Sequence, residues 1–571
     1  MRSYLLAGLA AFCVVALAVP LSVAPCQAQS RTPPRDQQPV AQNGTATVRG
    51  RVFAGDTGKP LRRARITLSG AELGGNNRTT STDLDGRYEL TDLPAGRYTL
   101  RVNRSGYLPL RYGQRRPLEP GKPLQVAEKQ VIDNVDFSLP RMSVITGRVM
   151  DEFNDPIEGV NVYALRSMYF NGRRQFVPTG SGQVRTDDAG QYRLLGLAPG
   201  SYFITAMTRE TWTVNRDGVK QVMGYAPTYF PGTTRVSDAR RVVLRLGQEA
   251  INTDFSLVPG RAATLTGTAV DSHGRPYQNV GVRQEVRGDD FGSFGTVASA
   301  TVASDGTFTI RNVPPGEYTL SASTARDSSE PDVALLPLVV DGVDIDNISL
   351  TGSAGGSVSG TVLTEDGTAP DIPRLRIVVS ERATGQPDPM VLGAFRNPGF
   401  GQVSPDGTFS INGIFGRTRL RVTLPDEWGL KAVLHDGRDI AEEPIELKSG
   451  EVLAGVQVIL TNRVTVVTGQ LADNQGAPLI DGTVIVFASN SERWVEESRF
   501  VKATRPDQQG QWQIKGLPPG DYLAVAVESV EDGQWNEPDY LESIRRYGQK
   551  LSLAEAGAQS VTLKLVTPGQ P

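Results

Sequence analysis

The sequence predicts an all-β protein built from tandem antiparallel β-sandwich domains, and three observations carry this prediction. A strand with a central glycine recurs five times, at intervals of 93 to 120 residues, and each interval is the size of one small sandwich domain. Turn residues separate short stretches in which apolar and polar side chains alternate, as expected for strands with one buried face. No helical periodicity is long enough for strand–helix–strand units. The 571 residues are also too many for one core.

The repeated unit contains three motifs. The first is the glycine strand, centred on Gly50, Gly147, Gly267, Gly360 and Gly469. The second is an aspartate–glycine turn followed by an aromatic residue, which is Tyr88, Tyr192, Phe308, Phe409 or Trp512. The third is a proline–glycine turn followed by a tyrosine, which is Tyr98, Tyr202, Tyr318 or Tyr522; the fourth unit has Phe415-Gly416 and Thr418 instead. We therefore predict five domains at 45–140, 141–258, 259–352, 353–461 (degenerate) and 462–571.

Each motif has a physical reason. Glycine in the first strand leaves room for a neighbouring backbone or ring. The aspartate–glycine element makes a hairpin corner, after which the aromatic side chain enters the core. The proline–glycine pair predicts a type II turn, in which the glycine takes a positive φ.

The N-terminal thirty residues resemble a secretory signal peptide. Arg2 forms a charged start, Leu5 to Ala24 form an apolar core, and Cys26-Gln27-Ala28 resembles a small-x-Ala cleavage site. We predict a signal at 1–28 and a flexible linker at 29–44. A retained anchor helix and a lipoprotein are the alternatives, although Pro25 precedes Cys26 where a lipoprotein signal has a small residue.

The signal predicts an exported protein, located in the periplasm, on the outer-membrane surface or outside the cell. No later run reaches the ~18 apolar residues of a membrane helix, so no membrane span is expected after signal removal. Both cysteines, Cys13 and Cys26, lie in the signal. The mature chain is therefore predicted to lack disulfides, a thiol nucleophile and thiolate metal ligands.

The motifs together resemble the carboxypeptidase regulatory-like domain. The pattern is G-x-V, then G-x-P-L-x-x-(A/V)-x-(V/I), then T-D-x-x-G-x-Y, then L-P-P-G-x-Y, and it covers nearly all of 45–571. The resemblance implies Greek-key β-sandwiches of the transthyretin-like or immunoglobulin-like kind, often grouped with starch-binding-like folds. The arrangement of the whole sequence is similar to that of bacterial envelope proteins that carry such modules in tandem. The metallocarboxypeptidase catalytic domain that accompanies these modules elsewhere has no counterpart in this sequence.

The pair Asp83 and Asp85 before Gly86 raises the alternative of a calcium loop. Calcium takes six to eight oxygen ligands, and an EF-hand loop ends in a glutamate at its twelfth position, where this chain has Pro94. Later copies keep a single aspartate at Asp305, Asp406 and Asp507. A turn aspartate that accepts backbone N–H groups explains the motif without a metal.

Few residues of catalytic type are present. The chain has two histidines, His273 and His435, which fall in different predicted domains and which we expect in exposed turns. A zinc hydrolase needs about three clustered ligands. We found no nucleophile elbow, phosphate loop or dinucleotide fingerprint. The prediction is a protein that is not an enzyme and needs no metal and no other cofactor.

Charge is divided unevenly along the chain. Residues 45–258 contain 30 Lys and Arg against 21 Asp and Glu, whereas residues 259–571 contain 26 against 40. Three interpretations remain open: solvated faces, head-to-tail contact between halves or molecules, and attraction to an anionic surface or polymer. An exported protein has little reason to meet nucleic acid.

Two insertions are the candidate ligand surface. They span 106–121 and 224–241 and combine aromatic rings, prolines and arginines. The rings suit stacking on sugar or peptide, and the arginines suit anionic groups. The alternative is that the rings pack on their own sandwich and seal contacts between successive units. The candidate residues are Tyr107, Arg111, Tyr112, Arg115, Trp212, Tyr225, Tyr229 and Phe230.

The leading functional prediction is a non-catalytic exported protein for cell-envelope structure or protein interaction. One alternative is a carbohydrate-binding protein acting on envelope or extracellular polysaccharide, and another is an accessory subunit of a hydrolase or an outer-membrane receptor. An envelope protein or a polysaccharide is the expected partner, and the oligomeric state is open. A short packed helix is also predicted within 537–551, from Leu541, Ile544 and Leu551 at near-helical spacing.

Overall fold

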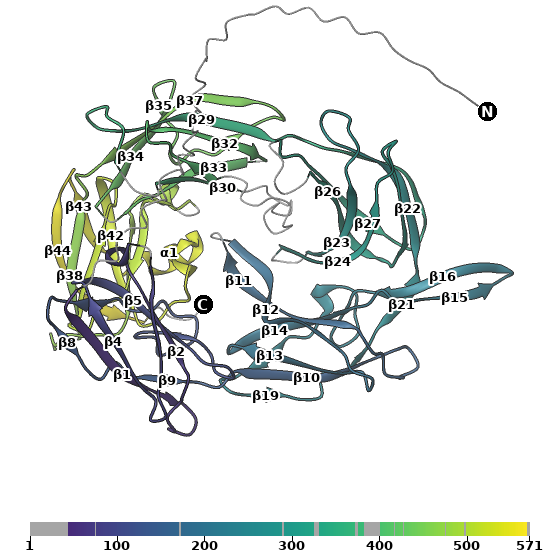
Figure 1. Cartoon of the computed structure of the whole chain (residues 1–571), viewed down its shortest axis with the longest axis horizontal. Helices are drawn as coiled ribbons and strands as arrows, with labels where there is room; N and C mark the ends of the chain where they lie inside the picture. Colours follow the sequence, from purple (N-terminus) through teal and green to yellow (C-terminus); the bar gives the residue numbers. More distant parts are fainter. Residues whose placement is uncertain are drawn as a thin grey trace, which may run out of the picture. The chain divides into compact units, whose positions relative to one another are not determined.

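The computed structural model describes residues 44–567 except 75, 171–172, 288–290, 325–329, 372–374, 382–399, 416, 426, 474 and 496–497. The predicted signal and almost all of the predicted linker lie outside the described residues. The described residues belong to one compact unit, Gln42–Pro571. No described helix is long and apolar enough to cross a membrane. Figure 1 shows that strands dominate the fold, which confirms the all-β prediction.

We name the predicted domains segments 1 to 5, while the division into five domains itself stays a prediction. Buried apolar residues form a separate cluster in each of segments 1, 2, 4 and 5, and a fifth cluster combines segment 3 with part of segment 2. The strands that carry each cluster belong to more than one sheet in segments 1 to 4 and to a single seven-stranded sheet in segment 5.

Segment 1 has two sheets, ordered β4-β1-β8 with β9 also on β1, and β3-β2-β5-β6 with β7 also on β5. Its strands are β1 (Ala46–Ala54), β2 (Arg65–Ser69), β3 (Arg78–Ser81), β4 (Arg87–Leu93), β5 (Gly96–Asn103), β6 (Leu110–Arg111), β7 (Leu124–Val126), β8 (Val131–Ile132) and β9 (Phe137–Leu139).

Segment 2 repeats this plan, with one sheet ordered β13-β10-β19 and β20 also on β10. Its strands are β10 (Ser143–Met150), β11 (Asn161–Phe170), β12 (Arg173–Arg185), β13 (Gln191–Leu197), β14 (Gly200–Met207), β15 (Thr211–Arg216), β16 (Val219–Ala226), β17 (Thr228–Tyr229), β18 (Val242–Leu244), β19 (Glu249–Ala250), β20 (Phe255–Ser256) and, at the boundary, β21 (Val258–Arg261).

Segment 3 shares a sheet with segment 2, because β12 pairs with β24. Its strands are β22 (Ala263–Val270), β23 (Asn279–Arg287), β24 (Phe291–Thr301), β25 (Thr307–Val313), β26 (Gly316–Ser323), β27 (Val333–Val340) and β28 (Ile345–Thr351). The two segments are therefore joined by backbone pairing as well as by a common core.

Segments 4 and 5 follow the same plan. The strands of segment 4 are β29 (Gly356–Thr364), β30 (Arg376–Glu381), β31 (Phe400–Gln402), β32 (Thr408–Ile414), β33 (Arg417–Thr423), β34 (Gly429–His435), β35 (Arg438–Asp439), β36 (Ile445–Glu446) and β37 (Val452–Thr461). Segment 5 has β38 (Val466–Ala472), β39 (Thr483–Ala488), β40 (Val501–Thr504), β41 (Gln511–Lys515), β42 (Gly520–Val527), α1 (Pro538–Arg545), β43 (Gln549–Leu553) and β44 (Ala558–Val566). Short 3-10 turns lie at η1 (Ala71–Leu73), η2 (Val236–Asp238), η3 (Ser491–Arg493) and η4 (Gln534–Asn536).

The sheets are mainly antiparallel, as predicted, and the first strand of each segment adds a parallel pair. In every segment the glycine strand pairs antiparallel with the strand after the aspartate turn, and parallel with the last strand of the segment. A parallel pair needs a crossover connection. The intervening strands of the second sheet supply it.

The strand glycines do what the sequence predicted. A Cβ atom on Gly50 would overlap the carbonyl oxygen of Val135 and approach the Tyr88 hydroxyl. The equivalent Cβ on Gly147, Gly267, Gly360 or Gly469 would likewise overlap a carbonyl oxygen of the parallel last strand or the residues before it. The aromatic residue after the turn is buried in each segment.

The aspartate motif is a turn. Asp83 Oδ1 accepts hydrogen bonds from the N–H groups of Asp85 (2.9 Å) and Arg87 (2.8 Å). Asp187 and Asp507 repeat both bonds, while Asp305 and Asp406 accept from the residue two positions on. The turn interpretation is confirmed.

The proline–glycine element is not a type II turn. Gly96 and Gly316 do not lie in the left-handed region, and Gly200 and Gly520 have φ of 146° and 151°, far from the roughly +80° that this turn requires. These glycines instead begin β5, β26, β14 and β42. The left-handed residue comes earlier. In segments 1 to 4 it lies at a bulge of the preceding strand, as Asp92, Gly196, Asn312 and Gly413, and in segment 5 it is Gly516, directly after β41.

The tyrosine that follows the proline–glycine element closes the short loop between the two strands with its hydroxyl. The hydroxyl of Tyr98, Tyr202, Tyr318 and Tyr522 donates to the carbonyl oxygen four residues earlier, at 2.6 to 2.9 Å. All four rings are at most 1% exposed. In segment 5 the predicted helix is confirmed as α1, with Leu541 and Ile544 buried; Leu551 lies in β43 instead.

Candidate functional site

The first insertion forms a closed loop at the edge of segment 1. Tyr112 and Lys122 are joined across its base, where Tyr112 N–H donates to Leu100 and Lys122 N–H donates to Tyr112. Gly113 has a φ of 75°, and a Cβ there would overlap the Lys122 side chain. The loop therefore presents its arginines outward from a fixed base.

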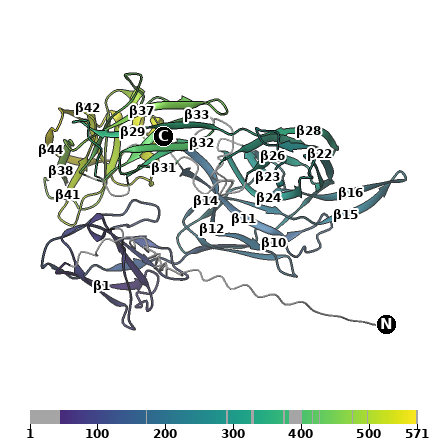
Figure 2. The same ribbon diagram turned by 45° about the horizontal axis from the view of Figure 1, so that its top comes forward.

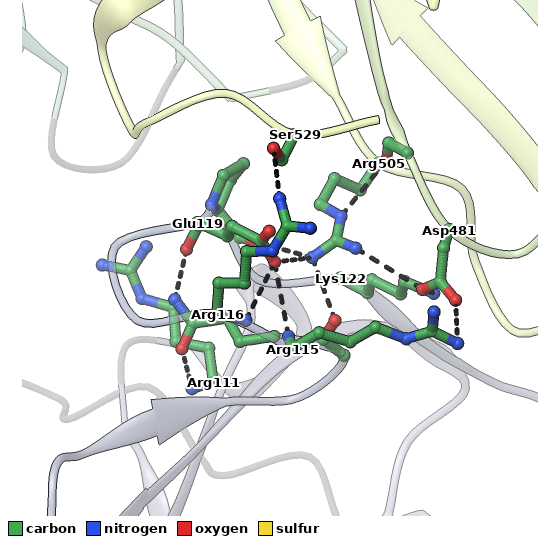
Figure 3. Close-up of polar contacts among 12 residues, drawn as sticks. Arg111, Arg115, Arg116, Glu119, Lys122, Asp481, Arg505 and Ser529 are labelled. Atoms are coloured by element: carbon green, nitrogen blue, oxygen red, sulfur yellow. Dashed lines mark hydrogen bonds and ion pairs between the residues drawn. The ribbon is translucent and has the colours of Figure 1, made fainter. Parts of the chain in front are cut away.

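Arg505 of segment 5 reaches into this loop, as Figure 3 shows. Its guanidinium donates to the carbonyl oxygens of Gly113 (2.9 Å) and Pro120 (3.0 Å), and lies 3.7 Å from the Glu119 carboxylate. Glu119 also accepts the backbone N–H groups of Arg115 and Arg116. The Arg505 side chain is only 4% exposed, so burial lowers its pKa, although both neighbouring carboxylates oppose that shift.

Asp481 of segment 5 is the second residue around which charged groups of the contact gather. It pairs with Lys122 Nζ at 2.6 Å, with Arg115, and with Arg505 at 3.5 Å. Lys122 is 6% exposed; burial lowers its pKa and Asp481 counteracts this. Removing one partner of a buried ion pair typically costs about 3–5 kcal/mol, because it leaves an unpaired charge. Asp481 is therefore the residue on which this contact depends most.

The rim of the contact is exposed. Arg111 lies 3.2 Å from Asp532, and Arg116 lies 3.3 Å from Glu528 and donates to Ser529 at 2.7 Å. Exposed ion pairs of this kind contribute at most about 1 kcal/mol each. Asp532 N–H also donates to the Leu118 carbonyl at 3.0 Å, so the two backbones meet directly.

The contact joins the basic half of the chain to the acidic half. Arg166 of segment 2, which is largely buried, adds a further ion pair with Glu531 at 3.0 Å. The structure thus shows contact between the halves, while Arg62, Arg63 and Arg65 of segment 1 are exposed, as the solvated-face interpretation expects. We name residues 106–122 together with 480–482, 505 and 528–532 the clasp.

A cleft of about 800 Å³ opens beside the clasp. It is lined by Arg111, Tyr112 and Arg115 of the first insertion, together with residues of segments 2 and 5. Tyr107 lies apart from the lining, with the Arg141 guanidinium 5.3 Å from its ring centre. The structure thus brings three of the candidate ligand residues to one cleft.

The tyrosine and phenylalanine rings of the second insertion pack into the hydrophobic cores. Tyr225, Tyr229 and Phe230 are 3% to 7% exposed. Tyr225 packs against half-buried Trp212 with ring centres 4.7 Å apart, and its hydroxyl donates to Glu152. Tyr229 accepts a hydrogen bond from Gln284 of segment 3 at 3.1 Å, so it seals the junction of segments 2 and 3. Whether any of the eight candidate residues binds a ligand stays a prediction.

Sequence reasoning missed Lys122, Asp481 and Arg505. Each is a charged residue in a loop, and nothing in the sequence marks it as buried. The available signal was the charge division, for which contact between the halves was one of three open interpretations, without named residues.

Both histidines of the chain, His273 and His435, lie within the described residues. Within the described ranges, no three His, Cys, Asp or Glu side chains are grouped to hold a metal ion. His273 is exposed in a turn, as predicted. His435 ends β34 and its side chain is 27% exposed, because it flanks the Asp436-Gly437 hairpin turn rather than occupying it; the prediction of an exposed turn position is wrong there.

The fold and the site define a class of protein, a tandem β-sandwich chain whose first and fifth segments are bound together. The family model of the carboxypeptidase regulatory-like domain matches residues 47–140 and 144–246. The two matched ranges lie in segments 1 and 2 and agree with the family that the sequence motifs indicated. For segments 3 to 5 the resemblance stays a prediction.

Known proteins add the following likenesses. Comparison with curated proteins gave no match. Among solved structures, the Bacillus anthracis TIE protein is 13% identical, with 74% of each chain covered and a TM-score of 0.15. A Streptococcal ancillary pilin is 12% identical over 54% of this chain and 98% of its own, with a TM-score of 0.17. The shaft pilin SpaA of Lactobacillus rhamnosus GG is 14% identical over 38% and 98%, with a TM-score of 0.19.

Proposed function

We propose that this is a non-catalytic exported protein that serves cell-envelope structure or protein interaction. The two carboxypeptidase regulatory-like domains and the tandem β-sandwich plan support a structural or interaction role. The signal-like N-terminus supports export. The observation that carries the proposal is the clasp. In it the buried, charged side chain of Arg505 binds the Gly113 carbonyl, 392 positions away in the sequence.

The clasp has a physical purpose in such a protein. The predicted mature chain has no cysteine, so no disulfide can fix its segments relative to one another. Isolated contacts between neighbouring domains are usually small and permit motion. A contact between the first and fifth segments restrains the segments between them.

Export is tested by fractionating cells that produce the full chain and sequencing its N-terminus. We expect the protein in the envelope or the medium, beginning after Ala28. A chain that starts at Met1 and stays in the cytoplasm would contradict the proposal.

The clasp is tested by disulfide trapping in a chain with Cys13 and Cys26 replaced by serine. The variant Leu118→Cys with Asp532→Cys should form an intramolecular disulfide, visible as faster migration on a non-reducing gel. Leu118→Cys with Val339→Cys, an exposed position in segment 3, is the matched control and should not. Adding Asp481→Asn to the first pair should lower its yield. Equal yields from all three would show that the clasp does not form in solution.

A second candidate is a carbohydrate-binding protein, and the cleft beside the clasp is the observation that favours it. Its volume is within the roughly 300–1,000 Å³ of small-molecule sites. A panel of neutral and acidic polysaccharides tests this candidate, and a flat response across the panel removes it.

A further inference from the structure

The cleft beside the clasp is rich in guanidinium groups with spare hydrogen-bond donors. Arg111, Arg115 and Arg141 all line it. Among the described residues each makes one ion pair, with Asp532, Asp481 and Asp56 respectively, and their side chains remain 47%, 72% and 55% exposed. A guanidinium has five N–H donors in a planar fork, so one ion pair leaves several donors for a ligand.

The acidic groups of the lining are already engaged. Asp56 accepts from Arg141, and Asp481 is shared between Arg115 and Lys122. Asp136 accepts the backbone N–H of Arg51 at 2.7 Å. Arg111, Arg115, Arg141 and Lys122 outnumber these three carboxylates in the lining. The cleft therefore favours a ligand that carries carboxylate groups.

The remaining lining is suited to the faces of sugar rings. Tyr112 is half-buried and held edge-on to Phe137, with ring centres 6.4 Å apart. Leu246 of segment 2 and Ile480 of segment 5 are 52% and 46% exposed. Turns and strand ends supply most of the lining, which does not suit an extended peptide that needs a strand edge to pair with.

The ligand would touch three segments at once. The lining includes Gly55 from segment 1, Arg141 and Gly247 from segment 2, and Asp481 from segment 5. The cleft is complete only when the clasp is closed. A ligand that binds the closed arrangement better than an open one stabilises it by mass action.

We infer that this cleft binds a carboxylate-bearing oligosaccharide through Arg111, Arg115 and Arg141, and that binding stabilises the clasp. This inference rests on the second candidate function and narrows it to one ligand chemistry and one site. Arg115 and Arg141 hold the carboxylates, and Tyr112 contacts a ring face.

The test is isothermal titration of the full chain with hexagalacturonate, with maltohexaose as the neutral counterpart and hexaglutamate as an acidic peptide. We expect binding of hexagalacturonate only, and a higher trapping yield of the Leu118→Cys/Asp532→Cys pair in its presence. The double variant Arg115→Gln/Arg141→Gln should bind at least tenfold more weakly. Arg62→Gln, an exposed arginine of segment 1 that is not part of the cleft lining, is the matched control and should bind as the native chain does.

Each other outcome overturns the inference in a distinguishable way. Binding of maltohexaose alone keeps the carbohydrate candidate and rejects the acidic ligand. Equal binding of hexaglutamate rejects the saccharide. Undiminished binding by the double variant rejects the site. No binding of any probe rejects the inference together with the second candidate, whereas the trapping yields without ligand test the clasp separately. If the double variant is less stable, Arg115→Lys/Arg141→Lys with an unchanged melting temperature repeats the measurement, since lysine lacks the guanidinium fork.

Discussion

At the scale of single residues, the strand glycines are the tightest constraint in this fold. The space that a side chain would occupy on Gly50 is filled by the carbonyl of Val135 and the Tyr88 hydroxyl, which themselves form a 2.6 Å hydrogen bond. Val135 lies between β8 and β9, and its N–H donates to the Arg49 carbonyl at 3.0 Å. Because this bonded backbone cannot move aside cheaply, the site tolerates no Cβ.

Gly50→Ala is therefore expected to destabilise segment 1 by about 3 kcal/mol. Gly281→Ala is the matched control, since Gly281 also lies in a strand but has no atom closer than 3.9 Å to the position of a Cβ. Urea unfolding followed by circular dichroism measures both. A Gly50→Ala chain as stable as the control would contradict the packing derived from the structure.

At the scale of elements, a bulge before the tyrosine strand of segments 1 to 3 replaces the turn that the sequence predicted. In segment 1, Ala46 pairs with Leu93 and Val48 with Leu90, so the β4 strand holds an extra residue opposite Thr47. Asp92 takes the left-handed conformation there, with a φ of 57°, and its equivalents are Gly196, Asn312, Gly413 and Gly516. Glycine and asparagine accept this conformation most readily.

This bulge can be tested by exchanging its left-handed residue. Asp92→Val should destabilise segment 1 by about 1–2 kcal/mol, since a β-branched residue is disfavoured at positive φ. Asp92→Gly should leave stability unchanged or raise it, as three other segments already have glycine. The melting temperatures of both variants, compared with that of the native chain, measure these stability changes. Equal melting temperatures would mean that the backbone relaxes out of the bulge.

The same elements show what could be predicted from the sequence. Five copies of one motif separated the constant features from the variable ones, so the strand glycines, the buried aromatics and the Asp83 turn were all predictable. The bulge was not, because aspartate, asparagine and glycine at one position look like ordinary turn variation. The parallel last strand was also missed, since local alternation carries no information on partner direction. The clasp depends on contacts between distant loops, for which charge balance was the only guide.

At the scale of the whole molecule, buried tyrosines make stability depend on alkaline pH. Burial raises the pKa of Tyr98 to about 12 and that of Tyr540 to about 12, and it also raises the pKa of Tyr88, Tyr192, Tyr318 and Tyr522 above the ordinary value of 10.0. A folded pKa above the unfolded one means that the folded chain keeps its phenolic protons while the unfolded chain loses them. The stabilisation is complete below about pH 10 and is lost as the pH rises towards the folded pKa.

The free energy of unfolding should therefore fall between about pH 10 and pH 11.5, by up to about 1.4 kcal/mol per pH unit for each tyrosine that ionises only when unfolded. Urea titrations across this range measure the slope, and tyrosinate absorbance of the folded chain counts the phenols that resist ionisation. Tyr98→Phe removes one such phenol, so its slope should be shallower than that of the native chain, which separates the tyrosine effect from the loss of lysine charge at the same pH. A native slope near zero, or tyrosinate absorbance that rises fully around pH 10 before unfolding, would show that these hydroxyls are open to solvent and that the loops they close are not held by the bonds to their carbonyl partners.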